Sequence, residues 1–139
     1  DPAITEEQVD QIKDAMTFDN TDNVEVNLIS ATLRVNIDTS DDASSANVKE
    51  IMNEAYDKVN EILPIKTYFT NNDSVKMYDL EVHVYNFIPD EEHSSDDQIY
   101  MIKTKTAAAD KPNVSTPSSP KNKEVAEELL QQQEEESTK

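Results

Sequence analysis

Apolar side chains in the middle of the chain recur at helical spacing between residues 45 and 63. They follow at i, i+3, i+4 and i+7 and continue in that phase, which places them on one side of a helix. The positions are Val48, Ile51, Met52, Ala55, Val59, Ile62 and Leu63. Ser44 or Ser45 can cap the first turn, and Pro64 ends the segment because its ring clashes with a continuing helix. The pattern predicts a long amphipathic helix over 45–63 that lies on another layer.

A second, shorter helical pattern lies near the start of the chain. Thr5 and Gln8 have the spacing of a capping box, in which each side chain hydrogen-bonds the backbone of the other residue. Val9, Ile12 and Met16 follow at i, i+3 and i+7. The pattern predicts a helix over 6–17 with a narrow apolar stripe at an edge of the core.

Alternation of apolar and polar residues predicts strands over 24–38, 65–70, 75–88 and 98–106. In the first of these the apolar positions change parity near 28–30, which indicates a bulge or bend. Together with the two helices, these strands predict an α+β fold. Its antiparallel sheet has about four strands, and the long helix packs on one face.

The strands at 75–88 and 98–106 can close a hairpin through the acidic loop at 90–97. A register that pairs Glu81 with Lys105 and His83 with Lys103 matches charge across the strands. The same register gathers aromatic and apolar side chains on the face away from the long helix: Tyr85, Phe87, Ile99 and Met101. Either the first helix covers this face, or the four residues form a protein contact.

Composition changes the picture at the C-terminal end. The 139 residues suffice for one domain, and 35% hydrophobic against 30% charged residues, with a mean hydropathy of -0.77, is polar for a fully folded chain. From Ala107 the sequence is rich in Pro, Ser and Glu. We therefore expect one domain over 1–106 and a disordered tail over 107–139.

The charge and the missing residue types exclude several functions. A net charge of -18 with one arginine, Arg34, argues against nucleic acid as a partner. The absence of Cys excludes disulfides and thiolate chemistry, and the absence of Gly disfavours phosphate-binding loops. No apolar run is long enough to insert into a membrane. Because the sequence begins at Asp1 and not at Met, we expect a processed form or fragment, with a membrane tether upstream.

Three groups of residues deserve weighing as metal or acid–base sites. Asp19, Thr21, Asn23 and Glu25 alternate oxygen ligands as a calcium loop does, but the required glycine is missing and a capped turn is favoured. The acidic run 90–97, which includes His93, could hold a divalent cation, although such runs are usually solvated. No catalytic or metal residue is therefore predicted from these segments.

The third group lies on the predicted strand at 75–88. Asp79 and Glu81 are a carboxylate pair on one face, and His83 follows on the same face. Lys103 and Lys105 opposite them favour ordinary salt pairs, with His83 as an exposed strand residue. We therefore predict that the protein is not an enzyme and holds no cofactor.

The order of the long helix and the strands 65–70, 75–88 and 98–106 resembles small extracytoplasmic domains of type IV secretion channel assembly proteins, which have a cystatin-like or nuclear-transport-factor-like fold. The Gly- and Cys-poor, Asn- and Asp-rich composition also resembles Gram-positive envelope proteins. The resemblance implies a non-enzymatic interaction or assembly domain at the cell surface, membrane-anchored and extracytoplasmic, in a conjugation or secretion channel. Its partners are other proteins or a second copy. The alternative is a small-ligand or metal-binding extracytoplasmic domain, with a pocket between the long helix and the concave sheet.

Overall fold

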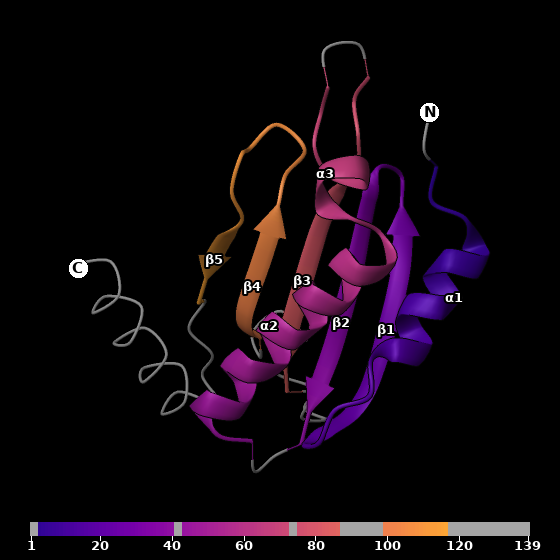
Figure 1. Ribbon diagram of the computed structural model, residues 1–139. Coiled ribbons are helices and arrows are strands. Elements are labelled where there is room, and N and C mark those ends of the chain that lie inside the picture. Colours follow the sequence, from indigo (N-terminus) through magenta and orange to yellow (C-terminus); the bar gives the residue numbers. More distant parts are fainter. Residues whose placement is uncertain (1–2, 41–42, 73–74, 87–98, 117–139) are drawn as a thin grey trace, which may run out of the picture.

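The computed structural model describes residues 3–40, 43–72, 75–86 and 99–116, with only the backbone of residues 99 and 100. Its elements are α1 (Glu6–Ala15), β1 (Thr21–Ile29), β2 (Thr32–Thr39), α2 (Ser45–Ile62), α3 (Ile65–Tyr68), β3 (Asp79–Tyr85), β4 (Ile99–Lys105) and β5 (Asn113–Ser115). Figure 1 shows α2 running diagonally across the sheet and α1 lying beside β1. The predicted α+β class is confirmed.

The sheet has five strands in the order β1-β2-β3-β4-β5. Neighbouring strands are antiparallel except β2 and β3, which run parallel. The expectation of a wholly antiparallel sheet is therefore wrong. Because α2 returns the chain to the end of the sheet where β2 began, β3 has to start beside β2 and run in the same direction.

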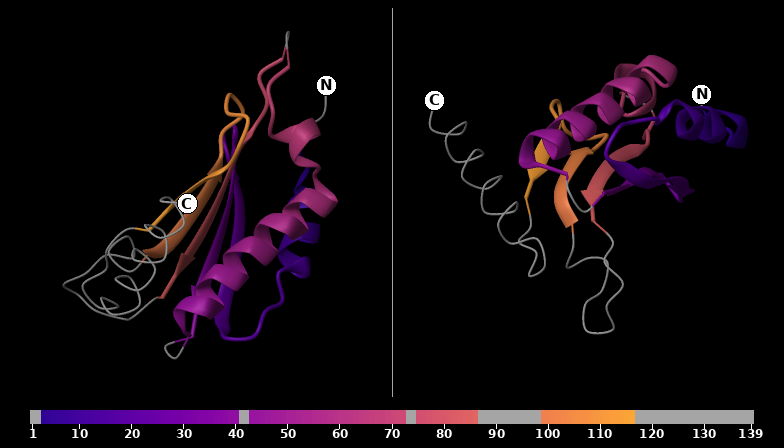
Figure 2. Two further views of the ribbon diagram at one scale, coloured as in Figure 1. Left: turned by 60° about the vertical axis from the view of Figure 1, so that its left-hand side comes forward. Right: turned by 90° about the horizontal axis from the view of Figure 1, so that it is seen from below.

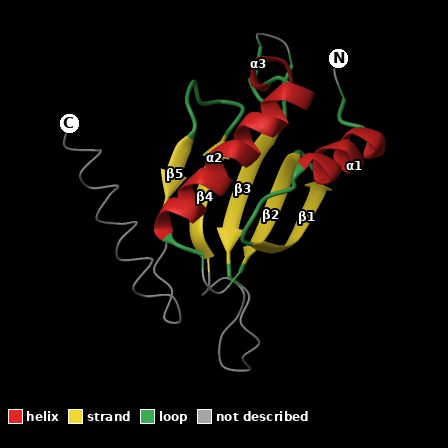
Figure 3. Cartoon of the chain, turned by 60° about the horizontal axis from the view of Figure 1, so that its bottom comes forward, coloured by secondary structure: helices red, strands yellow, loops and turns green. Residues whose placement is uncertain are grey.

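Both long helices pack on the same face of the sheet. Figures 2 and 3 show α1 and α2 on one side, and no described helix on the other. The first helix therefore does not cover the opposite face, and the alternative that α1 packs on that face is wrong. The core lies between α2 and the sheet, and its fully buried large side chains are Phe69, Ile12, Leu33, Ile37, Leu63, Leu80, Val35, Val48 and Val59.

The two predicted helices begin at the predicted caps. The N–H of Gln8 donates to Thr5 Oγ1 at 3.2 Å, and the N–H of Thr5 donates to Gln8 Oε1 at 2.9 Å. Ser44 caps α2 in the same way, with Asn47 as its reciprocal partner. These short-range bonds satisfy N–H groups that have no acceptor within a helix, so they fix where each helix starts.

The predicted strand over 24–38 is a hairpin of β1 and β2. Ile29 pairs with Thr32 across a turn in which Ser30 has φ 53°. The change of parity therefore marks a chain reversal and not a bulge. Positive φ is costly for a residue with a Cβ, and glycine is the usual residue at such positions. Because the sequence contains no Gly, Ser30 takes the positive φ in this turn and Asn20 (φ 61°) takes it in the turn before β1.

The predicted strand over 65–70 is wrong, because residues Ile65–Tyr68 form the helical turn α3. The N–H of Ile65 donates to Asn60 Oδ1 at 2.9 Å, and the N–H groups of Thr67 and Tyr68 both donate to the Pro64 carbonyl at 3.0 Å. The fixed φ of proline favours such a helical start. The turn places Phe69, which is 0% exposed, in the core.

The folded part extends past the predicted boundary at residue 106. β5 pairs with β4, and Ala107 and Thr116 are buried at 7% and 6% exposure. A disordered segment beginning at 107 is therefore wrong for residues 107–116. The remainder of the predicted tail, 117–139, lies outside the described residues.

Candidate functional site

The four predicted contact residues do not share one face of the sheet. Tyr85 lies on the face that the helices leave open, since it alternates with the buried Val84 along β3. Met101 is 3% exposed and belongs to the core. Phe87 and the side chain of Ile99 lie outside the described residues. The predicted patch is therefore wrong for Met101, and Tyr85 is its one member that the described residues place on the open face.

Met101 is misplaced because the register of β3 and β4 differs by one residue from the prediction. Lys105 pairs with Leu80 and not with Glu81, and Met101 pairs with Val84 and not with Tyr85. Side chains alternate between the faces of a sheet, so this shift of one residue moves Met101 and both lysines of β4 to the other face. The register shifts once more between Val84 and Tyr85, where Tyr85 pairs with Ile99. Met101 consequently faces the helices together with both lysines of β4.

The two lysines of β4 find neutral partners on the helix side. Lys105 is 2% exposed, and its Nζ donates to the carbonyl oxygens of Phe69 and Thr106, each at 2.9 Å. Lys103 Nζ lies 4.2 Å from the centre of the Tyr56 ring and donates to Asn53 Oδ1 at 3.2 Å. The prediction that these lysines neutralise Asp79 and Glu81 is therefore wrong.

Burial shifts the pKa values of Lys103 and Tyr56, which contact each other. It lowers the pKa of the Lys103 amine below 10.5, a shift that the nearby Asp57 carboxylate opposes. Burial, followed by the charge of Asp57, raises the pKa of Tyr56 above 10.0. The contact between the ammonium and the ring is a cation–π pair at the boundary between α2 and β4.

The open face carries a small charged network centred on Glu81. Glu81 Oε1 lies 2.8 Å from His83 Nε2 and 3.3 Å from Arg34 Nε, on the neighbouring strand β2. The Arg34 Nε group makes no hydrogen bond there, so its contact with Glu81 is electrostatic. Arg34, and not a lysine, is therefore the cation beside Glu81. The His83 side chain, at 15% exposure, is more covered than expected.

The carboxylate of Asp79 has a different kind of partner from that of Glu81. Its Oδ1 accepts the backbone N–H of Ala107 at 2.7 Å, which holds the segment after β4 against β3. The two carboxylates thus have different partners, one backbone and one ionic. This arrangement stabilises strand ends and neighbouring strands, and it does not present a paired acid and base to a substrate.

Tyr85 lies among carboxylates on the open face. It pairs with Asp38 across β2 and β3. Burial, then the charges of Asp38 and Glu25, raise the pKa of Tyr85 above 10.0. A half-buried tyrosine offers both a ring and a hydroxyl, which is the kind of side chain that protein contacts favour.

The candidate calcium residues are distributed over a turn and a strand. Asp19 lies in the turn before β1, where Thr21 Oγ1 donates to the Phe18 carbonyl at 2.7 Å, and Glu25 lies within β1. Among the described residues no group of three or more His, Cys, Asp or Glu is close enough to hold a metal ion. The acidic run 90–97 and His93 lie outside them.

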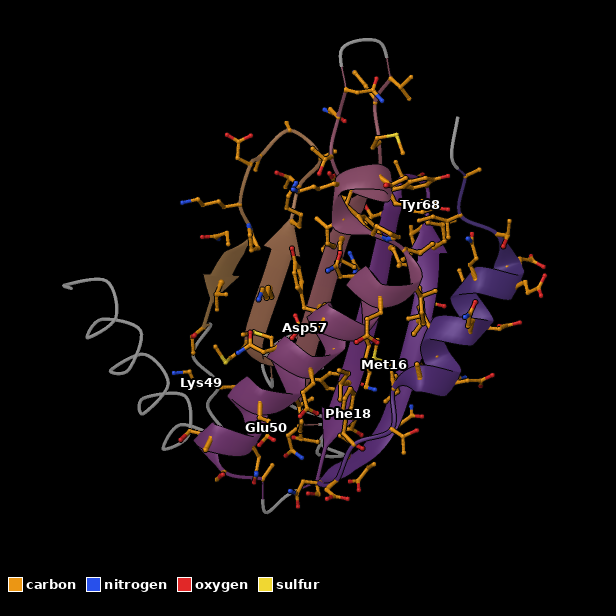
Figure 4. The ribbon with its side chains drawn as sticks, viewed as in Figure 1. Met16, Phe18, Lys49, Glu50, Asp57 and Tyr68 are labelled. Carbon is orange, nitrogen blue, oxygen red and sulfur yellow. The ribbon has the colours of Figure 1, made fainter. Side chains whose placement is uncertain are left out.

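A polar hollow of about 290 Å³ lies between the turn at 17–20 and α2. Phe18, Asp19, Glu50 and Glu54 contribute to its lining, and Figure 4 labels Phe18 and Glu50 at this end of the molecule. The small-ligand alternative placed its pocket between the long helix and the sheet. The hollow is instead at the side of α2, because core side chains fill the space beneath it.

The edge strand β1 is a surface that the sequence prediction missed. Within the described residues β1 pairs with β2 alone. Leu28 and Ile29, at its end, are 36% and 51% exposed and are the large hydrophobic residues most exposed in the described chain. The sequence signal for this surface was the adjacent pair Leu28 and Ile29. Neighbouring residues of a strand point to opposite faces of the sheet, so such a pair places one apolar side chain on each face.

Two hollows follow one another between α1 and β1. The first, of about 390 Å³, is lined among others by Val9, Asp10 and Leu28, and the second, of about 540 Å³, by Lys13 and Asp22. The N-terminal half of α1 lies beside the end of β1, and the C-terminal half beside its beginning. An elongated depression therefore accompanies the free edge of the sheet.

No protein-family model, curated protein or solved structure matches the chain. None of the described helices is both long and apolar enough to cross a bilayer.

Proposed function

We propose that this chain is a non-enzymatic protein-interaction domain that contacts its partner through β1 and the adjoining open face of the sheet. The observation that carries the proposal is the nine-residue edge strand β1, which is paired on one side only among the described residues and ends in the exposed Leu28 and Ile29. An edge of this kind offers backbone N–H and C=O groups to another chain.

The sequence of β1 supports a contact role for this edge. Proteins usually protect free edges with charged residues, above all lysine, or with proline, bulges or very short strands. β1 is nine residues long and contains neither lysine nor proline, and its protection is confined to two carboxylates and a bulge between Thr21 and Asn23. It carries Asp22 and Glu25, so two copies of the strand repel each other while a partner of opposite charge does not. These features favour a foreign protein over self-association.

A narrower form of the proposal assigns the domain to an extracytoplasmic, membrane-anchored protein of the cell envelope, in a conjugation or secretion channel. The acidic, Gly-free and Cys-free composition supports this form. The element order behind it has one strand fewer than expected, because 65–70 contains α3. The interaction role does not depend on the narrower assignment.

Site-specific photo-crosslinking in the native host tests the interaction role. A benzophenone amino acid at Ile29 or at Tyr85 should give a discrete protein adduct on illumination. The same group at Glu61, an exposed residue of α2, is the matched control. If neither Ile29 nor Tyr85 gives an adduct above the Glu61 control, the proposed function is wrong.

A further inference from the structure

We infer that the groove between α1 and β1 takes an extended, basic segment of a partner protein, which adds to the sheet as a further strand beside β1. This inference rests on the proposed function, because it names the chemistry of the partner at the same edge. Peptides bind other domains in this way when a helix flanks an accessible sheet edge.

The helix side of the groove is one continuous face of α1. The residues of α1 that line the two hollows are spaced i, i+3, i+4, i+7 and i+8, and such positions share one side of a helix. They are Glu6, Val9, Asp10, Lys13 and Asp14. The buried Ile12 lies off this face and anchors α1 to the core. The lining is therefore free to contact a segment without unpacking the helix.

The strand side of the groove is long enough to pair with a segment of useful length. Nine residues of β1 span about 30 Å at 3.3 Å per residue, whereas ten residues of α1 span about 15 Å. A bulge between Thr21 and Asn23 interrupts the ladder at the first end. The remaining stretch, 23–29, contains no proline, so alternate residues can direct both N–H and C=O toward an added strand.

The side chains of β1 divide an added strand into two rows. Val24 and Val26 are covered on the helix side, whereas Glu25 and Asn27 are exposed on the open face. An added strand would place every second side chain beside the two valines and under α1. The other row would lie beside Glu25. The pattern that fits is an alternation of apolar and cationic residues.

The charges around the groove select the cationic partner. Its lining carries Glu6, Asp10, Asp14 and Asp22 against the single Lys13, and Glu25 lies on the open face of the same edge strand. A second copy of β1 would add its own Asp22 and Glu25 to this acidic edge, and like charges on paired strands are destabilising. Segment 124–136 of the same chain is itself rich in glutamate. Charge complementarity therefore favours a foreign basic segment over either of these occupants.

The test uses the full chain and a fluorescein-labelled ten-residue peptide of alternating lysine and valine. We expect saturable binding by fluorescence anisotropy, with slowed amide exchange at 21–29. An alternating glutamate and valine peptide tests the charge requirement. A lysine and valine peptide with N-methyl groups on alternate residues tests strand pairing, because it keeps the charge and loses backbone donors. Both should bind at least about tenfold more weakly, the equivalent of 1.4 kcal/mol.

Charge reversal locates the binding site. The double variant Asp10→Lys, Glu25→Lys should weaken binding of the lysine and valine peptide about tenfold, since it replaces two attractive contacts with the peptide lysines by repulsive ones. The matched control is Glu50→Lys, Glu54→Lys, which makes the same change of net charge at the polar hollow beside α2. It should weaken binding less than about threefold, through the net charge alone.

Three results would overturn the inference: equal weakening by both double variants, equal binding of the N-methylated peptide, or unchanged amide exchange at 21–29. A photo-adduct at Ile29 that joins two copies of this chain would assign the groove to a second copy and overturn it as well. None of these results removes an adduct with another protein at Tyr85. The inference can therefore fail while the proposed function stands, and only the loss of adducts at both positions contradicts the latter.

Discussion

The two faces of the sheet are built from the same strands and differ in almost every property. Along β3 the side chains of Leu80, Val82 and Val84 are 0% exposed beneath the helices, while the intervening Glu81 and His83 contact each other at 2.8 Å on the open face. The core that stabilises the fold therefore lies on one side of the sheet. Charged side chains on the other side and along the β1 edge are not required for packing that core.

The largest expected effect comes from shortening a side chain on the covered face. Leu80→Ala should lower the free energy of unfolding by about 2–5 kcal/mol, through lost burial and the cavity left behind. The matched open-face change is Asn36→Ala on the adjacent strand, for which we expect less than about 1 kcal/mol. Urea denaturation of both variants measures the contrast. Equal losses would contradict the division between a packed face and an open face.

The two lysines of β4 allow a comparison within the covered face, because both side chains lie on it. Lys105→Met should cost about 1–3 kcal/mol, because it takes the Lys105 donor away from the buried Phe69 carbonyl. The Thr106 carbonyl still accepts the N–H of Ala109 at 3.1 Å. Lys103→Met removes a cation–π contact at the rim and should cost less than about 1 kcal/mol. Chemical denaturation at neutral pH compares the two. A larger loss for Lys103→Met would show that the hydrogen bond from Lys105 to the Phe69 carbonyl, directly after α3, contributes less to stability than the cation–π contact.

The smallest effects appear at alkaline pH and differ in sign between Tyr85, on the open face, and Lys103, on the covered face. The raised pKa of Tyr85 means that the folded state keeps its proton when the unfolded state has lost it, so stability falls from pH 10.0 upward through the folded pKa. The lowered pKa of Lys103 acts in the opposite sense, because the unfolded state binds the extra proton and stability rises with pH up to 10.5.

Urea titrations between pH 8 and 11 separate these two contributions. Tyr85→Phe should make the alkaline loss of stability less steep, and Lys103→Met should make it steeper by removing a rise. Tyr56, whose pKa is also raised, is retained in both variants, but Lys103→Met removes the ammonium that lies 4.2 Å from its ring. If Tyr85→Phe leaves the slope unchanged, the carboxylates of Asp38 and Glu25 do not act on Tyr85 as the structure indicates.

The candidate site could be predicted only in part. Alternation placed Tyr85 on the open face because it needs no knowledge of the neighbouring strand. Met101 was placed wrongly because its face depends on its pairing with Val84. The alternating Lys103 and Lys105 on the same strand suggested that this row of side chains faces solvent. Their partners, Phe69, Asn53 and Tyr56, lie far away in the sequence. The groove was missed because it requires α1 to lie beside β1, which no local pattern records.

The sequence by itself determined the two main helices and where they begin, since a capping box and an apolar stripe act between residues three or four apart. Tertiary structure alone decided that Ile65–Tyr68 is a helical turn, that β2 and β3 are parallel, and which face β4 turns to the core. Those choices depend on contacts between distant segments, whose free energies outweigh the local preference of a short segment.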